Sequence, residues 1–300
     1  NNAFDGRTTV QSNGYIIVAS ANALGSTNGA TFIEDGAYIR IDGGAGSGLT
    51  IAEPITMTGD ASLTWAGTLR SNSGSNIWSG RITANNARLR CESGACFEII
   101  GGVDGSALIC SAYGNRWIRF TEKPITTSTL TSHTGDGGFI LAVGGNTFSS
   151  FSACGYFVRI DVPNAWPPTL TLTQGDGGNG ASLLNLNGND QTVGKWQTAR
   201  DSAEPRILFS VAPATLTVNQ NSDSLFNGSI TGAVSILKLG TGNLTLTNKF
   251  ISTSGSFTVS NGALTVSNVG TLGNYSTNIV VGGTGALLLS NSLAVADSAT

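Results

Sequence analysis

The chain has 300 residues, a formal net charge of −3 and only 11% charged residues, less than half the roughly 25% of an average soluble protein. Its 15 Lys and Arg form no basic cluster, which argues against nucleic-acid binding, and no apolar run approaches the ~18 residues of a membrane-spanning helix. A single histidine, His133, excludes two-histidine metal sites, and we expect no metal ion and no cofactor. The 41 glycines and 40% hydrophobic residues favour a folded, strand-rich chain over long helices or disorder.

The N-terminal part of the chain, from position 1 to 110, contains short runs in which apolar and polar residues alternate. Glycine-rich turns separate many of these runs. Alternation with a period of two predicts strands with one buried face. The predicted strands lie at residues 49–51, 55–57, 63–65, 89–91 and 97–100.

The four cysteines are Cys91, Cys96, Cys110 and Cys154, and all four are candidates for disulfide bonds. No C-x-x-C pair is present, so a structural zinc site is not expected. The spacing between Cys91 and Cys110 is close to the repeat length found below, so these two can stack on neighbouring strands. Alternatively, Cys91 and Cys96 close the turn between them, or the cysteines are small buried hydrophobic residues.

Residues 111–170 repeat least and are interpreted as irregular coils or an insertion, where binding residues are expected because loops carry function. Arg116 and Trp117 lie in the run NRWIRF, and Trp166 lies in the proline-stiffened run VPNAWPP. An exposed indole can stack on a sugar ring, so these three residues are candidate ligand-binding residues. The alternative is a cap or a loop folded back, with Trp117 and Phe120 in the core.

Residues 171–300 contain a repeat whose three units align without gaps. Leu237, Phe257 and Val280 begin these units, LKLGTGNLTLTN, FTVSNGALTVSN and VVGGTGALLLSN. Apolar, glycine and asparagine positions coincide in columns, the first apolar column being Leu237, Phe257 and Val280. Hairpins would also alternate, but a recurrence every roughly 20–23 residues is the length of one coil of a parallel β-solenoid. We therefore predict an all-β fold: one solenoid segment over residues 1–300 of a longer protein, with early coils at 1–110 and regular coils at 171–300.

The first of these three sequence repeats also resembles a repeat of a known protein family. The run ILKLGTGNLTLTN at residues 236–248, preceded by FNGSITG at 226–232, resembles the autotransporter-associated β-strand repeat of bacterial passenger domains. Residues 71–83 and 184–194 resemble phrases of the same large repeat proteins. The resemblance implies a right-handed parallel β-helix, export, and an extracellular or bacterial cell-surface location. It brings no catalytic residues to this chain.

Acidic residues are the remaining candidates for chemistry. Asp136 and Asp176 lie about two repeat lengths apart in matching Gly-Asp-Gly-Gly runs, which predicts either one acidic column or a repeated Asp-Gly turn. We expect a non-enzymatic structural or adhesive solenoid (a surface stalk, adhesin or fibre-forming segment) that associates with itself or with surface glycans. The alternative is a carbohydrate-active enzyme on the same fold, a polysaccharide lyase or glycoside hydrolase, which needs carboxylates that converge with a cation in one groove.

Overall fold

The computed structural model describes residues 2–59, 68–133, 135–154, 157–175, 181–199, 205–249, 251–269, 271–272, 278–290 and 294–295. These residues form strands and turns, and the strands pair in parallel to make a β-solenoid of about 12 turns in the described part of the chain. The chain divides into two compact units, residues 1–148 and 149–300, here called unit 1 and unit 2. The predicted fold class is confirmed. The predicted strand at 63–65 lies outside the described residues.

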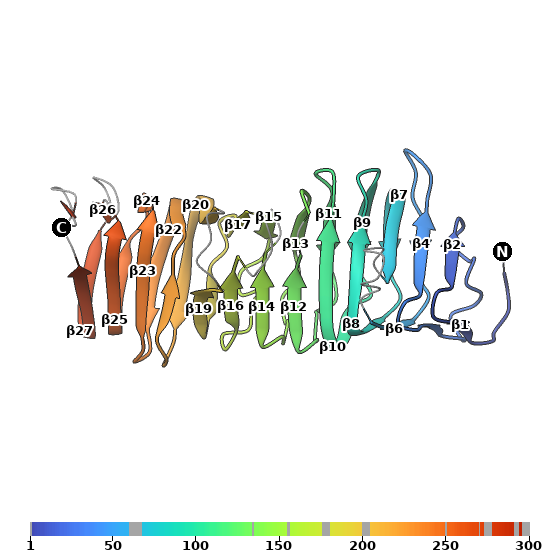
Figure 1. Cartoon of the computed structure of the whole chain (residues 1–300), viewed down its shortest axis with the longest axis horizontal. Coiled ribbons are helices and arrows are strands. Elements are labelled where there is room, and N and C mark those ends of the chain that lie inside the picture. The colour runs from blue at the N-terminus through green and yellow to red at the C-terminus, as the bar shows by residue number, and fades with distance from the viewer. Residues whose placement is uncertain are drawn as a thin grey trace. The chain divides into compact units, whose positions relative to one another are not determined.

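Unit 1 holds the first thirteen strands, which Figure 1 shows lying side by side in blue to green. They are β1 (Thr8–Val10), β2 (Tyr15–Val18), β3 (Thr31–Ile33), β4 (Tyr38–Asp42), β5 (Thr50–Ile51), β6 (Ile55–Thr58), β7 (Leu69–Trp78), β8 (Ile82–Cys91), β9 (Ala95–Ile99), β10 (Val103–Ala112), β11 (Trp117–Phe120), β12 (Thr129–Ser132) and β13 (Gly138–Leu141).

Three stacks of parallel strands surround the core of unit 1. One runs through β1, β3, β6, β8 and β10, and the second through β2, β4, β7, β8, β10 and β12. The third contains β5, the second half of β7, β9, β11 and β13, and it carries the site described below. Its inner column, Trp78, Ile99, Phe120 and Leu141, is fully buried. Each coil covers the apolar face of the last, so a core forms although no single coil has one.

Unit 2 holds the remaining strands. They are β14 (Ser150–Ala153), β15 (Phe157–Ile160), β16 (Thr171–Gln174), β17 (Ser182–Asn185), β18 (Gln191–Val193), β19 (Lys195–Thr198), β20 (Arg206–Asn219), β21 (Ser224–Phe226), β22 (Ser229–Leu239), β23 (Asn243–Lys249), β24 (Ile251–Thr253), β25 (Phe257–Val269), β26 (Thr271–Leu272), β27 (Ile279–Ser290) and β28 (Ala294–Val295).

Each sequence repeat in the last third of the chain contains two strand segments. The predicted residue columns are confirmed for the second segment of each repeat and are shifted for the first. Leu244, Leu264 and Leu287 are direct partners, as predicted, and the first two are buried. Phe257, however, pairs with Ile236 and Ile279 and not with Leu237 and Val280. Between β25 and β27, a register irregularity between Val259 and Asn261 absorbs the difference, which is the usual effect of a β-bulge. The last member of the predicted asparagine column, Asn291, lies outside the described residues.

Candidate functional site

The candidate site is a groove on the outer face of β7, β9, β11 and β13, all in unit 1. It has a volume of about 260 Å³. Since side chains alternate between the two faces of a strand, the residues beside the buried column point outward in two rows. The rows are Ser75, Cys96, Trp117 and Gly138, and Ile77, Glu98, Arg119 and Ile140. We call this surface the Trp117 groove.

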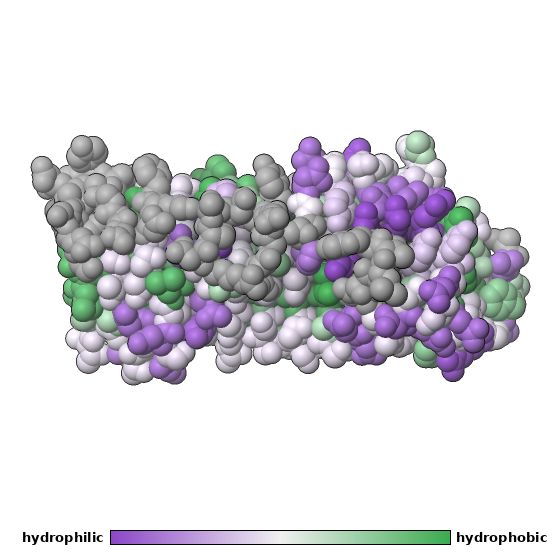
Figure 2. Space-filling view, in the orientation of Figure 1, coloured by the Kyte–Doolittle hydropathy of each residue, from purple (hydrophilic) through white to green (hydrophobic). Residues whose placement is uncertain are grey.

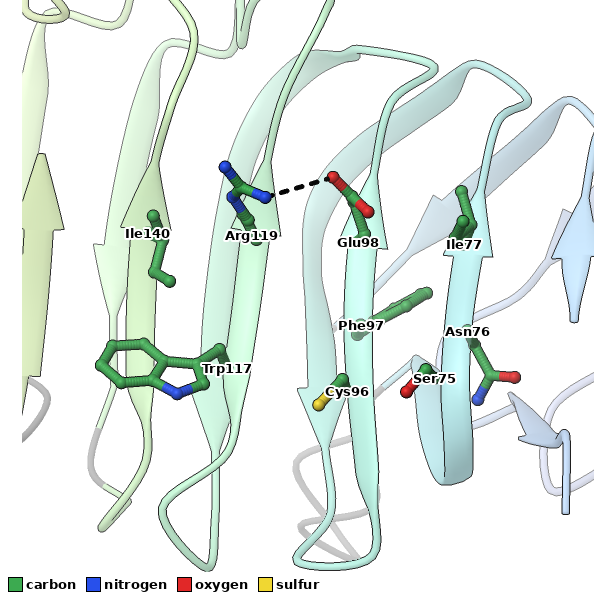
Figure 3. Close-up of a pocket in the computed structure, with 9 residues that line it drawn as sticks. All are labelled: Ser75, Asn76, Ile77, Cys96, Phe97, Glu98, Trp117, Arg119 and Ile140. Carbon is green, nitrogen blue, oxygen red and sulfur yellow. Dashed lines mark ion pairs between the residues drawn. The ribbon is translucent and has the colours of Figure 1, made fainter. Parts of the chain in front are cut away.

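The indole of Trp117 forms the apolar floor at one end of the groove. Figure 3 shows its ring reaching from β11 toward the strand that carries Ile140. The ring covers Gly138, because a Cβ placed on Gly138 would lie 2.1 Å from indole Cζ3. Trp117 is half-buried and its neighbour Ile118 is fully buried. The ring is therefore held against the sheet with part of its surface open to solvent.

An ion pair forms the polar side of the groove. An Nη of Arg119 lies 3.8 Å from Oε1 of Glu98, and the hydroxyl of Thr121 donates a 3.0 Å hydrogen bond to the same oxygen. Figure 3 shows the two charged side chains turned toward each other. Both side chains are about one-third to one-half exposed, so they can still donate to and accept from a bound molecule.

Arg116 and Trp166, the other predicted ligand-binding residues, lie elsewhere. Arg116 is exposed, and its Nε donates a 2.9 Å hydrogen bond to the carbonyl oxygen of Ser93 in the turn of the preceding coil. Trp166 is only 2% exposed, so the expectation of an exposed ring there is wrong. Its backbone amide donates to Oε1 of the buried Gln191, 3.2 Å away, and the loop folds inward because burial of the indole removes a large apolar surface from water.

The cysteines are all thiols in the structure. The spacing of Cys91 and Cys110 predicted that they stack on neighbouring strands, and this prediction is wrong. Cys91 pairs with Ala112, and Cys110 pairs with Leu89. The coil here is longer than the spacing between the two cysteines, so their sulfurs lie out of register. Cys154 is buried as well. No disulfide closes the turn between Cys91 and Cys96 in the structure either.

Cys91 and Cys96 differ in environment although they flank one turn. Burial raises the pKa of Cys91 to about 12, with smaller contributions from Cys96 and Glu92 that outweigh the opposing effect of Arg116. Burial also raises the pKa of Cys110. Cys96, by contrast, is half-buried and lines the Trp117 groove. Because thiolates are the reactive form, we expect Cys91 and Cys110 to react slowly at neutral pH.

Several acidic residues, including the predicted candidate Asp136, bond to neighbouring groups of the solenoid. Asp42 pairs with Arg40 and accepts from the amide of Asn72, and Asp161 pairs with Arg159. Oδ1 of Asp136 accepts from the backbone amide of Gly114, one coil earlier. Asp176 lies outside the described residues. No group of three or more His, Cys, Asp or Glu that could hold a metal ion occurs in the described ranges.

Stacked arginines form a second polar surface in unit 1. Arg40, Arg70 and Arg90 are direct partners in successive coils, and Glu92 pairs with both Arg70 and Arg90. The guanidinium of Arg90 also lies 4.4 Å from the ring centre of Tyr113. Figure 2 shows hydrophilic side chains gathered over the area of β4 and β7. The ion pair between Glu92 and Arg70 joins neighbouring coils, whereas Arg90 and Glu92 belong to the same coil; a pair of this kind contributes about 0.2–1 kcal/mol.

Comparison of the chain with protein-family models, with curated proteins and with solved structures finds no match. The parallel β-solenoid is therefore established by the structure, while the resemblance to autotransporter passenger domains stays a prediction. Among the described residues there is no helix long and apolar enough to cross a membrane.

Proposed function

We propose that this chain is a segment of a non-enzymatic, extracellular β-solenoid that serves as a structural or adhesive element, of the kind found in bacterial autotransporter passenger domains. The observation that carries the proposal is the coil register. Ser75, Cys96 and Trp117, like Ile77, Glu98 and Arg119, occupy equivalent outer positions in consecutive coils. A solenoid of this kind presents extended rows of side chains on a rigid scaffold, which suits multivalent contact and mechanical support.

The inter-coil role of the charged residues also supports a structural function. Arg81 pairs with Asp104 of the next coil, and Arg119 pairs with Glu98 of the preceding one. Oδ1 of Asp190 accepts a 2.7 Å hydrogen bond from the backbone amide of Thr215, also across coils. These side chains connect neighbouring coils and so help to stabilise the stack.

Electron microscopy of the purified chain at several concentrations tests the proposal. We expect filaments, or isolated particles that resist proteolysis and bind to glycan-coated surfaces. The same preparations are incubated with a panel of polysaccharides, and the release of reducing ends or unsaturated sugars is measured. Turnover above that of the heat-denatured chain would overturn the proposal in favour of the carbohydrate-active enzyme, and Glu98→Gln would then show whether the groove is responsible.

A further inference from the structure

The lining of the Trp117 groove restricts the chemistry of any ligand it binds. The half-buried side chains of Trp117 and Ile77 offer apolar surface, and Glu98 and Arg119 offer polar groups within the same groove. Ile140 also lines the groove but is only 5% exposed. A matching ligand must therefore have one apolar face and polar groups around its edge. The volume of about 260 Å³ lies just below the roughly 300–1,000 Å³ of sites for drug-sized molecules, so it suits one small ring.

The charges in the groove indicate a neutral ligand. Glu98 and Arg119 lie 3.8 Å apart and offset each other, so this part of the surface carries no net charge. The carboxylate can accept hydrogen bonds, and the guanidinium can donate them. A pair of this kind suits hydroxyl groups, which donate and accept at once, better than a phosphate or an ammonium, which requires an excess of the opposite charge.

The position of the indole supplies the remaining constraint. Trp117 is fixed against Gly138, and its half-buried side chain lines the groove beside the ion pair. The C–H face of a pyranose packs on an indole, while its hydroxyl groups lie at the edge of the ring. We propose that the Trp117 groove binds a neutral sugar ring of a glycan, stacked on Trp117 with its hydroxyl groups hydrogen-bonded to Glu98 and Arg119. This inference rests on the proposed adhesive function and names its ligand.

The test is binding of the whole chain to an array of neutral and amino-sugar oligosaccharides, followed by a fluorescence titration with the oligosaccharide that binds best. We expect saturable binding that Trp117→Ala weakens at least 10-fold. The matched control is Tyr15→Ala, which removes another exposed aromatic ring of unit 1. Tyr15 is 59% exposed and stacks on Tyr38 at 5.3 Å between ring centres, so the control tests whether any outer aromatic ring is sufficient.

Cys96 gives a second readout that does not depend on removing the indole. Because this thiol lines the groove, a bound sugar should slow its alkylation by at least threefold in the unaltered chain. Glu98→Gln keeps the size of the side chain and removes its charge, and it should weaken binding while leaving the fold intact. Circular dichroism of each variant identifies any that fails to fold.

The outcomes separate the inference from the proposed function. Binding that survives Trp117→Ala, absence of binding across the array, or alkylation of Cys96 that no bound sugar slows would overturn the sugar site. Each would leave the structural role to be decided by the microscopy. Degradation of the array glycans would overturn the non-enzymatic function instead, while stable binding lost in Trp117→Ala and retained in Tyr15→Ala supports both.

Discussion

The indole of Trp117 covers the α-carbon of Gly138 on the neighbouring strand, and a Cβ at Gly138 would lie 2.1 Å from Cζ3 and 2.2 Å from Cε3 of the ring. Such distances are far inside van der Waals contact, so the position of the ring depends on the missing side chain at Gly138. An aromatic side chain packed over a cross-strand glycine is a known way to protect an exposed backbone and fix the register of the pair.

Gly138→Ala should therefore displace the Trp117 ring from the groove. We expect a red shift of the Trp117 emission, a loss of stability of about 1–2 kcal/mol from the forced shift, and at least 10-fold weaker sugar binding. Gly144→Ala is the matched control, because a Cβ there meets nothing within 4 Å. Unchanged emission in Gly138→Ala would show that the ring does not rest on the glycine.

Thiol reactivity should distinguish the two cysteines of one turn. At neutral pH we expect iodoacetamide to alkylate Cys96 at least 10-fold faster than Cys91, because Cys96 is half-buried whereas burial raises the pKa of Cys91 to about 12. Mass spectrometry of peptides over time measures both rates. Protection of both thiols until a reductant is added would contradict this prediction and support a disulfide across the turn.

The fold could be predicted because its signal is local and repeated. Alternation with a period of two defines each strand, and the recurrence of Leu244, Leu264 and Leu287 defines the coil. The pairing of Phe257 with Ile279 could not be predicted, since an ungapped alignment has no place for the irregularity between Val259 and Asn261. A bulge changes hydrogen bonding without a sequence signature, so only the structure reveals it.

The site could be predicted only in part. The sequence marks Trp117 as an aromatic residue among cations and Trp166 as an aromatic residue in a proline-stiffened run, but Trp166 is buried. Ile77, Gly138 and Ile140 were missed because nothing in their local sequence indicates a site. Stepping by one coil length from Trp117 and Arg119 would have found them, since Ile77, Glu98, Arg119 and Ile140 are successive partners at a constant interval.

Replacement of the buried Glu53 should change stability in a pH-dependent way. Glu53 is 3% exposed; burial raises its pKa, and a 2.8 Å hydrogen bond from the Thr31 hydroxyl acts in the opposite direction. Between the ordinary pKa and this raised value the folded state binds more protons than the unfolded state, so stability falls as pH rises through that window.

Glu53→Gln removes the charge and should stabilise the chain by about 1 kcal/mol at pH 7, with the gain vanishing below the ordinary glutamate pKa. Denaturant unfolding between pH 4 and pH 8 measures the difference. The control is the exposed Glu122, for which Glu122→Gln should change little at any pH. A difference independent of pH would show that the charge of Glu53 is not the cause.

Lys238 in unit 2 should be required for the stability of its coil. The side chain is fully buried between Val218 and Val259 of the adjacent coils, and its burial lowers the pKa of the amine. Its Nζ donates hydrogen bonds to the carbonyl oxygens of Leu239 and Gly240 at 2.5 and 2.9 Å, and lies 3.4 Å from that of Asn261 in the next coil.

Lys238→Met keeps the length of the side chain and leaves these carbonyl oxygens without their donor. An unsatisfied buried acceptor costs about 1–3 kcal/mol, and this cost exceeds the gain from no longer burying an amine that already has its hydrogen bonds. We expect a loss of about 2 kcal/mol in unfolding free energy and faster hydrogen exchange at residues 239–247. Lys195→Met, at a half-buried position of β19, should cost much less. A stability of Lys238→Met equal to or above that of the unaltered chain would mean that the desolvation of the amine dominates.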